Sequence, residues 1–278
     1  MYKPFVKWSI VFLLLHNVFF HLNIYNGEYG FRGNVSYLYE FKDYAIGAVH
    51  ILTSMSDTAQ LLGGYWFLKS LFVGSIFGYV IIKYVKSPVY GGGILLCLTL
   101  GLAYLQINVP YFGIGAKEFF AAEFFVLGFY YKKYKISIHK YVIIVPFGIV
   151  IITFGVHYYQ ATLLRFLWWQ VVPYMLTATV GLLAVFYVSK IIEKCHNKGC
   201  ALLVYIGNNT LTILTWHMLS FKIVSLLIIL IYELPIARMA EFPVIEEYSK
   251  QGWFFLYFIV GVLVPLWMTK SKYLKQNG

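Results

Sequence analysis

Charge is scarce in this chain. Asp, Glu, Lys and Arg together make up 12% of the 278 residues, whereas 60% of the residues are hydrophobic. A soluble domain of this length could not hide so much apolar surface from water, because large apolar side chains need an interior or a lipid phase. The composition therefore excludes a soluble globular protein and predicts an integral membrane protein.

The motifs of common soluble enzymes are also missing. The chain has no glycine-rich phosphate loop, no His-Glu-x-x-His and no Gly-x-Ser-x-Gly. There are three cysteines: Cys97 lies in an apolar run, and Cys195 and Cys200 flank a short basic loop. We interpret this pair as two loop thiols in a reducing cytosol, so no metal site is expected. Any chemistry must come from the few polar groups inside the apolar runs.

Apolar runs long enough to cross a bilayer account for most of the chain. A membrane helix needs about 20 apolar residues, so we expect an all-α, polytopic transmembrane bundle of about eight spans, in a single domain over residues 1–278. No cleavable signal peptide is evident, so the first span is expected to stay. The expected spans are about 5–22, 62–82, 91–107, 112–131, 141–156, 166–189, 206–232 and 253–269.

The positions of the lysines predict the orientation of the bundle. With a cytoplasmic N-terminus, 14 of the 22 basic residues lie at inner ends of spans, and five lie in outer segments. Cytoplasmic loops carry such an excess, which accounts for the net charge of +11 better than nucleic-acid binding does. We expect both termini to be cytoplasmic. The long loops at about 23–61 and 233–252 are then external, as lids or binding loops or as passive connectors.

Ionisable residues inside spans are costly and mark candidate functional groups. They are Lys69, Lys117, Glu118, Glu123, His217 and Lys222, with His16 and His21 in the first span. We expect Lys69, Glu118 and the deeper His217 to share a polar cavity reached from outside, with Trp66 at its mouth. The alternative is that Lys69 and Lys117 extend to the outer interface while Glu118 pairs with one of them. Lys222 is the weakest candidate, because its side chain has the length to extend outward to the interface.

His217 lies at membrane depth and has two interpretations. It follows Trp216, with Thr210 and Thr212 nearby, so it is either a functional group or a hydrogen-bonded packing element. Asn209 is placed to cap the helix that contains His217, with its side chain accepting hydrogen bonds from amides one turn later.

Four short segments match one family pattern in order and spacing. They are Lys3-Pro4-Phe5, residues 64–72 (GYWFLKSLF), residues 124–133 (FFVLGFYYKK), and residues 205–213 (YIGNNTLTI) followed by Trp216-His217. Together they resemble the membrane acyltransferase 3 family, bacterial O-acyltransferases that modify surface polysaccharides and related glycans. The resemblance implies a helical bundle in a bacterial cytoplasmic (inner) membrane. It also implies acyl transfer, typically of acetyl, from an acyl-CoA to a hydroxyl of a cell-surface glycan or glycolipid.

The chain departs from the family pattern near its start. Family members usually begin with two further spans, the first carrying an Arg followed eleven positions later by the His held to be central to transfer. The residues eleven positions before the seven histidines are Phe5, Ile10, Tyr39, Gly128, Pro146, Val185 and Ile206, and none is basic. The resemblance implies either an N-terminally incomplete form or another histidine in that role. We expect the first, and hence no acyl transfer by these 278 residues alone.

The resemblance also suggests roles for individual residues. His217 is the remaining candidate for catalysis or for support of acceptor binding, Trp66, Lys69 and Glu118 are candidates for substrate binding, and Lys3 and Lys7 for the donor phosphates. A plain rim of cytoplasmic lysines is the alternative for the last two. Acetyl-CoA or another acyl-CoA is expected as co-substrate, with no tightly bound cofactor. The expected partners are membrane lipid and a glycan or glycolipid, without nucleic acid.

Two rival functions stay open at this point. A transporter or flippase for a glycolipid or polysaccharide would use the same external cavity without making a bond. Secondary transporters tend to show internal repeats, and the sequence has no convincing repeat. An inactive structural remnant of an acyltransferase would show neither activity, so whether the chain is an enzyme is left to experiment.

Overall fold

The computed structural model describes residues 1–31, 33–56, 59–134, 166–194 and 198–276, together with residues 148, 155, 162 and 163. Helices dominate these residues, and no β-strand occurs among them. The prediction of an all-α fold is confirmed. Apart from residues 148 and 155, the expected span 141–156 lies outside the described residues, and so does Cys195.

Five helical stretches in the described part of the chain are long and apolar enough to cross a membrane. They are α4 (Tyr65–Val85), α5 (Pro88–Leu105), Trp168–Lys194 with α8 (Val171–Lys194), α10 (Thr210–Ile231), and Glu246–Met268 with the first part of α12 (Phe254–Gln276). Each coincides with an expected span, so the chain is a multi-pass membrane protein. The total of about eight spans stays a prediction.

The other helices are shorter or more polar. The first expected span contains α1 (Tyr2–Leu14) and α2 (His16–His21), which meet at Leu15. The span expected at 112–131 is α6 (Ala116–Lys133), whose first two turns carry Lys117, Glu118 and Glu123. The remaining elements are α3 (Phe41–Ser54), α9 (Lys198–Asn208), α11 (Glu246–Tyr248), the 3₁₀ turns η1 (Gly33–Val35), η2 (Gln60–Leu62), η4 (Trp168–Gln170) and η5 (Ile236–Ala240), and the π turn η6 (Ser249–Trp253).

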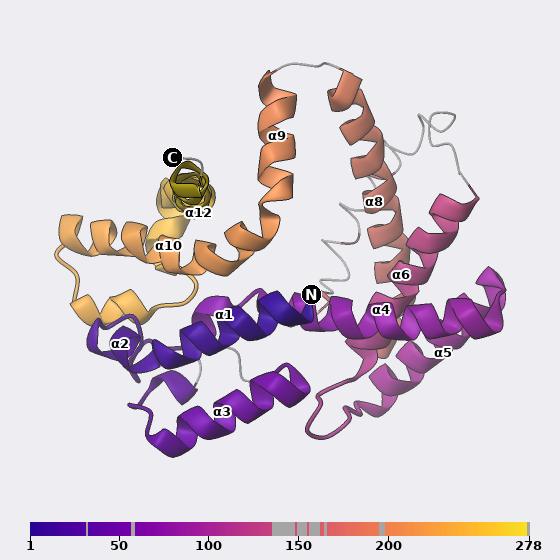
Figure 1. Cartoon of the computed structure of the whole chain (residues 1–278), viewed down its shortest axis with the longest axis horizontal. Helices are drawn as coiled ribbons and strands as arrows, with labels where there is room; N and C mark the ends of the chain where they lie inside the picture. The colour runs from indigo at the N-terminus through magenta and orange to yellow at the C-terminus, as the bar shows by residue number, and fades with distance from the viewer. Residues whose placement is uncertain are drawn as a thin grey trace. The chain divides into compact units, whose positions relative to one another are not determined.

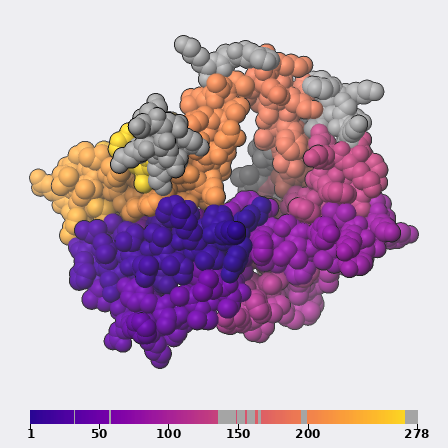
Figure 2. All heavy atoms as spheres, in the orientation of Figure 1, coloured from indigo at the N-terminus to yellow at the C-terminus, as the bar shows by residue number. Residues whose placement is uncertain are grey.

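The chain forms two compact units, residues 1–68 with 203–278 and residues 69–202. In the first unit α10 packs against α12 and against the turns η2 and η5, while α1 packs against α3 (Figure 1). The spheres of α1 and α3 form one continuous indigo-to-violet surface (Figure 2). In the second unit α5 packs along α6, and η4 contacts both α5 and α8.

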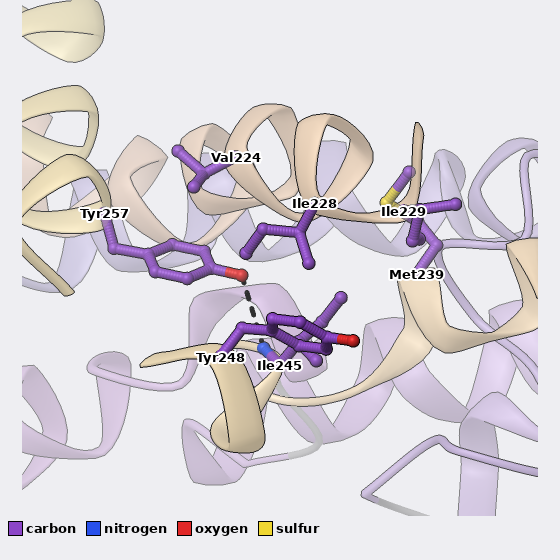
Figure 3. Close-up of a cluster of buried hydrophobic side chains, with 7 residues drawn as sticks. All are labelled: Val224, Ile228, Ile229, Met239, Ile245, Tyr248 and Tyr257. Carbon is purple, nitrogen blue, oxygen red and sulfur yellow. Dashed lines mark hydrogen bonds between the residues drawn. The ribbon is translucent and has the colours of Figure 1, made fainter. Parts of the chain in front are cut away.

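A buried apolar cluster in the first unit fixes the segment that follows α10. Its members come from α10, η5, α11, α12 and the residue before α11, and are Val224, Ile228, Ile229, Met239, Ile245, Tyr248 and Tyr257 (Figure 3). The Ile245 N–H donates to the Tyr257 hydroxyl at 3.3 Å, and the same hydroxyl lies 3.0 Å from Ser225 Oγ. The loop expected at 233–252 is therefore packed back onto the helix that precedes it.

The prediction that the Asn209 side chain caps α10 is wrong. Asn209 stands at the N-cap position without a side-chain cap hydrogen bond, and its Nδ2 donates to the Tyr205 carbonyl at 2.9 Å. The reason is that α9 ends at Asn208, one residue earlier. The carbonyls of its last turn lie next to Asn209, and the Tyr205 carbonyl accepts from both the backbone N–H and the side-chain amide of Asn209.

Small residues bring α4 and α6 close together in the second unit. A Cβ added to Gly74 would lie 2.9 Å from both Ala121 Cβ and Ala122 N, and one added to Gly78 would lie 2.6 Å from Phe125 Cδ1. Gly74 and Gly78 are four residues apart, so both face α6 from successive turns. This spacing is the small-xxx-small pattern of membrane helix pairs, in which backbone contact replaces hydrophobic attraction.

We expect Gly74→Ala to destabilise the protein by about 1–2 kcal/mol, because the new methyl group overlaps the backbone of α6 and outweighs the gain in helix propensity. Gly128→Ala is the matched control, since a Cβ at Gly128 meets no atom within 4 Å. It should be neutral or slightly stabilising. Thermal unfolding of both variants in detergent measures the difference, and equal midpoints would contradict the close packing of α4 on α6.

Candidate functional site

His16, at the start of α2, is enclosed by residues of the first long loop. It is 3% exposed, and its ring stacks on Tyr39 with the ring centroids 3.5 Å apart. Nε2 lies 3.1 Å from the Tyr37 carbonyl oxygen. A carbonyl only accepts, so Nε2 carries the proton in the neutral ring and Nδ1 keeps a lone pair. No hydrogen-bond partner of Nδ1 is found among the described residues.

Asn17 ties the loop to α2 beside this ring. Its Oδ1 accepts from the Tyr39 N–H at 2.8 Å, and its Nδ2 donates to the Tyr39 carbonyl at 3.0 Å. The fully buried Tyr25 adds a second ring, whose centroid lies 5.2 Å from that of His16. Together these contacts set both the orientation and the tautomer of the imidazole, which is what a general base requires.

Lys3 and Lys7 lie on α1, upstream of His16, and both are exposed. The Lys7 ammonium sits 5.1 Å from the centroid of the neighbouring Trp8 ring. Lys7 and His16 are nine residues apart in an almost continuous helix. At about 1.5 Å per residue this separates them by about 14 Å along the axis.

Glu118, in the first turn of α6, is the centre of the polar cluster in the second unit. It is fully buried, with Oε2 accepting from the Gly115 N–H at 2.8 Å and Oε1 from the Ser70 hydroxyl at 3.1 Å. Lys117 Nζ lies 3.7 Å from Oε1. The carboxylate thus caps α6, joins it to α4, and sits at the helix end where the macrodipole favours negative charge.

Lys69 lies beside this cluster but is not the ion-pair partner of Glu118. Its side chain is 8% exposed, and Nζ donates to the carbonyl of Phe112 in the loop before α6. The structure therefore pairs Glu118 with Lys117, while Lys69 interacts with the Glu118 charge at longer range and its neighbour Ser70 donates to the carboxylate.

A cavity of about 410 Å³ adjoins the start of α6. Four of its lining residues are polar, namely Gln106, Asn108, Lys117 and Gln170, and the rest are Leu102, Ala103, Ile107, Ala116, Phe166 and Leu167. Neither Lys69 nor Glu118 lines it. Amides beside apolar and aromatic walls can hydrogen-bond hydroxyl groups while covering an apolar face. Among the described residues, no group of three or more His, Cys, Asp or Glu side chains is placed to hold a metal ion.

The other two predicted site residues, Trp66 and His217, lie in the first unit. Trp66 is half-buried in the first turn of α4, and its ring lies nearly perpendicular to that of Phe67 with the ring centroids 6.0 Å apart. His217 Nδ1 lies 3.0 Å from the carbonyls of both Ile213 and Leu214, one turn earlier in α10. These contacts fit the packing interpretation of His217, but they leave a lone pair on Nε2, so a functional role stays a prediction. Because Lys69 and Glu118 belong to the second unit, a cavity shared with His217 stays a prediction.

The His16 site was only partly visible in the sequence. His16 stood out by its depth in an apolar run, but no sequence pattern assigned a role to Asn17, Tyr37 or Tyr39. The sequence feature that could have indicated this site is the His16-Asn17 pair, which follows three leucines and precedes an aromatic loop.

Comparison with known proteins places the chain in one family. No curated protein and no solved structure matches it. A sequence model of the acyltransferase 3 family, described as an acyltransferase domain, matches residues 1–270. That range includes all four segments that carry the sequence resemblance and the residues around His16. The chain therefore belongs to the acyltransferase 3 family of membrane acyltransferases.

Proposed function

We propose that this protein transfers an acyl group, in the simplest case acetyl, from an acyl-CoA to a hydroxyl of a cell-surface glycan or glycolipid. Family membership supports the reaction class, and the apolar helices support a membrane location. The structural observation that carries the proposal for this chain is His16, a buried imidazole held at Nε2 by the Tyr37 carbonyl. None of the seven histidines has a basic residue eleven positions before it, so the sequence pattern did not identify a general base. We assign this role to His16.

The proposed reaction uses the lone pair on His16 Nδ1. The acceptor hydroxyl attacks the thioester carbonyl while Nδ1 removes its proton, so that a C–O bond forms as the C–S bond breaks. The thiolate of CoA leaves and takes up a proton. The hydrogen bond from Nε2 to the Tyr37 carbonyl stabilises the imidazolium that forms and holds the ring in place.

Lys3 and Lys7 are the proposed contacts for the donor phosphates. Ammonium groups form strong charge-assisted hydrogen bonds with phosphate, and both side chains are exposed at the first turns of α1. The pantetheine arm of CoA separates its phosphates from the thioester. Lys7 and His16 are about 2.5 helical turns apart, so the arm would have to pass around α1 to bring the thioester to His16.

Acceptor binding is proposed for Trp66, Lys69 and Glu118, with His217 in support. The buried contacts of Lys69 and Glu118 favour a role in shaping the second unit, and the adjoining cavity offers the amides of Gln106 and Asn108 to sugar hydroxyls. Neither Lys69 nor Glu118 lines this cavity. The observation that supports the proposal is that both lie close to it, next to Lys117, which does line it.

Membranes containing the full chain and radiolabelled acetyl-CoA test the proposed function. Transfer predicts release of CoA thiol together with label in the glycan or glycolipid fraction. A glycolipid transporter would move its cargo without releasing CoA. Membranes that release no CoA and label no acceptor would instead support the expectation from the sequence, that these 278 residues alone are inactive.

We further propose that the protein lies in the bacterial inner membrane with both termini in the cytoplasm. In a chain with its native cysteines replaced by serine, Lys250→Cys should react with an impermeant maleimide in intact cells. Lys275→Cys should react only after the cells are opened, because the lysine-rich end stays inside. Labelling of the Lys275→Cys chain from outside would overturn this topology.

A further inference from the structure

A hollow along one face of α10 plays no part in the proposed reaction. It has a volume of about 450 Å³ and lies within the first unit. The α10 residues on one face of its wall include Trp216, Leu219, Ile223 and Leu226, at the three-to-four-residue spacing of a helix face. Ten residues separate Trp216 from Leu226, which is about 15 Å of helix. The hollow is therefore a long groove rather than a round pocket.

The remaining walls of the hollow are almost entirely apolar. Leu22 and Ile24 contribute from the chain after α2, Ile236 and Met239 from η5, and Val264 and Met268 from α12. Ser220 and Lys222 are the polar residues among those that line it, and Lys222 is the charged one. Such a lining suits a hydrocarbon chain that carries one anionic group.

The ammonium of Lys222 meets a carbonyl but no carboxylate. Lys222 is 4% exposed, and Nζ donates to the backbone oxygen of Glu241 at 2.5 Å. No ion pair that includes Lys222 is found in the described part of the chain. Lys222 therefore reaches the segment that follows α10, and its side chain is buried there.

The nearby carboxylate of Glu241 is already occupied. Arg238 Nε donates to Glu241 Oε1, and this hydrogen bond raises the pKa of Arg238 above its usual range. Arg238 therefore stays charged and keeps its partner. Glu241 attracts the Lys222 ammonium at longer range but forms its ion pair with Arg238, so the desolvation cost of the buried cation is only partly offset. An anion in the hollow next to Lys222 would remove that cost.

We propose that this hollow binds an anionic membrane lipid, with its phosphate at Lys222 Nζ and one acyl chain along α10 between Leu226 and Trp216. A free phosphate would leave the apolar walls uncovered, and a neutral lipid would leave Lys222 without a counter-charge. The proposal concerns lipid binding alone and does not depend on acyl transfer.

The test compares two lipids with identical chains on the purified full chain in a neutral detergent. Dioleoyl phosphatidylglycerol should raise the thermal unfolding midpoint with increasing concentration, because a ligand that binds only the folded state stabilises it. Dioleoyl phosphatidylcholine and inorganic phosphate should have little effect. Equal shifts from both lipids, or the full shift from inorganic phosphate alone, would overturn the proposal.

Two variants locate the site. Lys222→Met should weaken the apparent affinity for phosphatidylglycerol at least tenfold, whereas Lys250→Met, at a side chain 74% exposed, should leave it unchanged. Leu226→Trp keeps the charge and fills the groove, so it should also lose the phosphatidylglycerol effect. Circular dichroism confirms that each variant is folded. A folded Leu226→Trp chain with an unchanged lipid shift would show that no acyl chain lies along α10.

Discussion

Replacing His16 by glutamine is expected to lower the rate of acyl transfer by about 10²–10⁴-fold, the usual contribution of a positioned general base. Glutamine retains an amide N–H that can donate to the Tyr37 carbonyl, so the loop should stay in place. It has no basic nitrogen, and the acceptor hydroxyl then attacks without proton removal. The loss should fall on kcat with KM for the acyl-CoA unchanged, because the donor phosphates are held elsewhere.

His217→Gln is the matched control for this experiment. His217 Nδ1 donates to the carbonyls of its own helix, and the side-chain amide of glutamine can donate to the same carbonyls. Because His217 is proposed only to support acceptor binding, kcat should change little and any effect should fall on KM for the acceptor. Thermal unfolding of both variants separates a chemical effect from loss of structure. If the His217 variant were inactive and the His16 variant fully active, His16 would not be the general base. His217, the catalytic candidate from the sequence, would then be assigned that role.

The membrane helices could be predicted from the sequence because length and hydropathy alone decide which segments cross a bilayer. The apolar runs at 62–82 and 206–232 became α4 and α10 almost without change. Lysine clusters at the ends of these apolar runs then predict which ends of the membrane helices face the cytoplasm. None of these inferences requires knowledge of which residues touch.

The polar sites could not be predicted in the same way, because their partners are distant in sequence. His16 is held by Tyr37 and Tyr39 from an irregular loop, and loops follow no hydrophobic period. Lys222 was expected to extend outward, yet a carbonyl 19 residues later binds it. The position of an ionisable residue inside an apolar run shows that the residue needs a polar partner. The fold determines which partner it has.

The sequence also left open whether Glu118 pairs with Lys69 or with Lys117. Among the proposed variants, removal of the Glu118 carboxylate is expected to give the largest loss of stability. Glu118→Ala removes the cap of α6, the contact with Ser70 and the partner of Lys117 in one step. Loss of one member of a buried ion pair costs about 3–5 kcal/mol. Because Lys117 is 28% exposed and partly solvated, we expect the lower end of that range, about 3 kcal/mol.

Glu118→Gln divides this loss into its parts. The amide oxygen of glutamine can still accept from the Gly115 N–H, so the cap survives while the charge is lost, and we expect about 1–2 kcal/mol. Glu246→Gln is the control, since that side chain is 79% exposed in its pair with Lys250, and exposed ion pairs contribute little to stability. Unfolding by denaturant in detergent should rank the variants, from least to most stable, as Glu118→Ala, Glu118→Gln and Glu246→Gln. If Glu118→Ala were as stable as Glu246→Gln, the carboxylate would not hold α6 to α4, and a substrate-binding role for Glu118 would gain support.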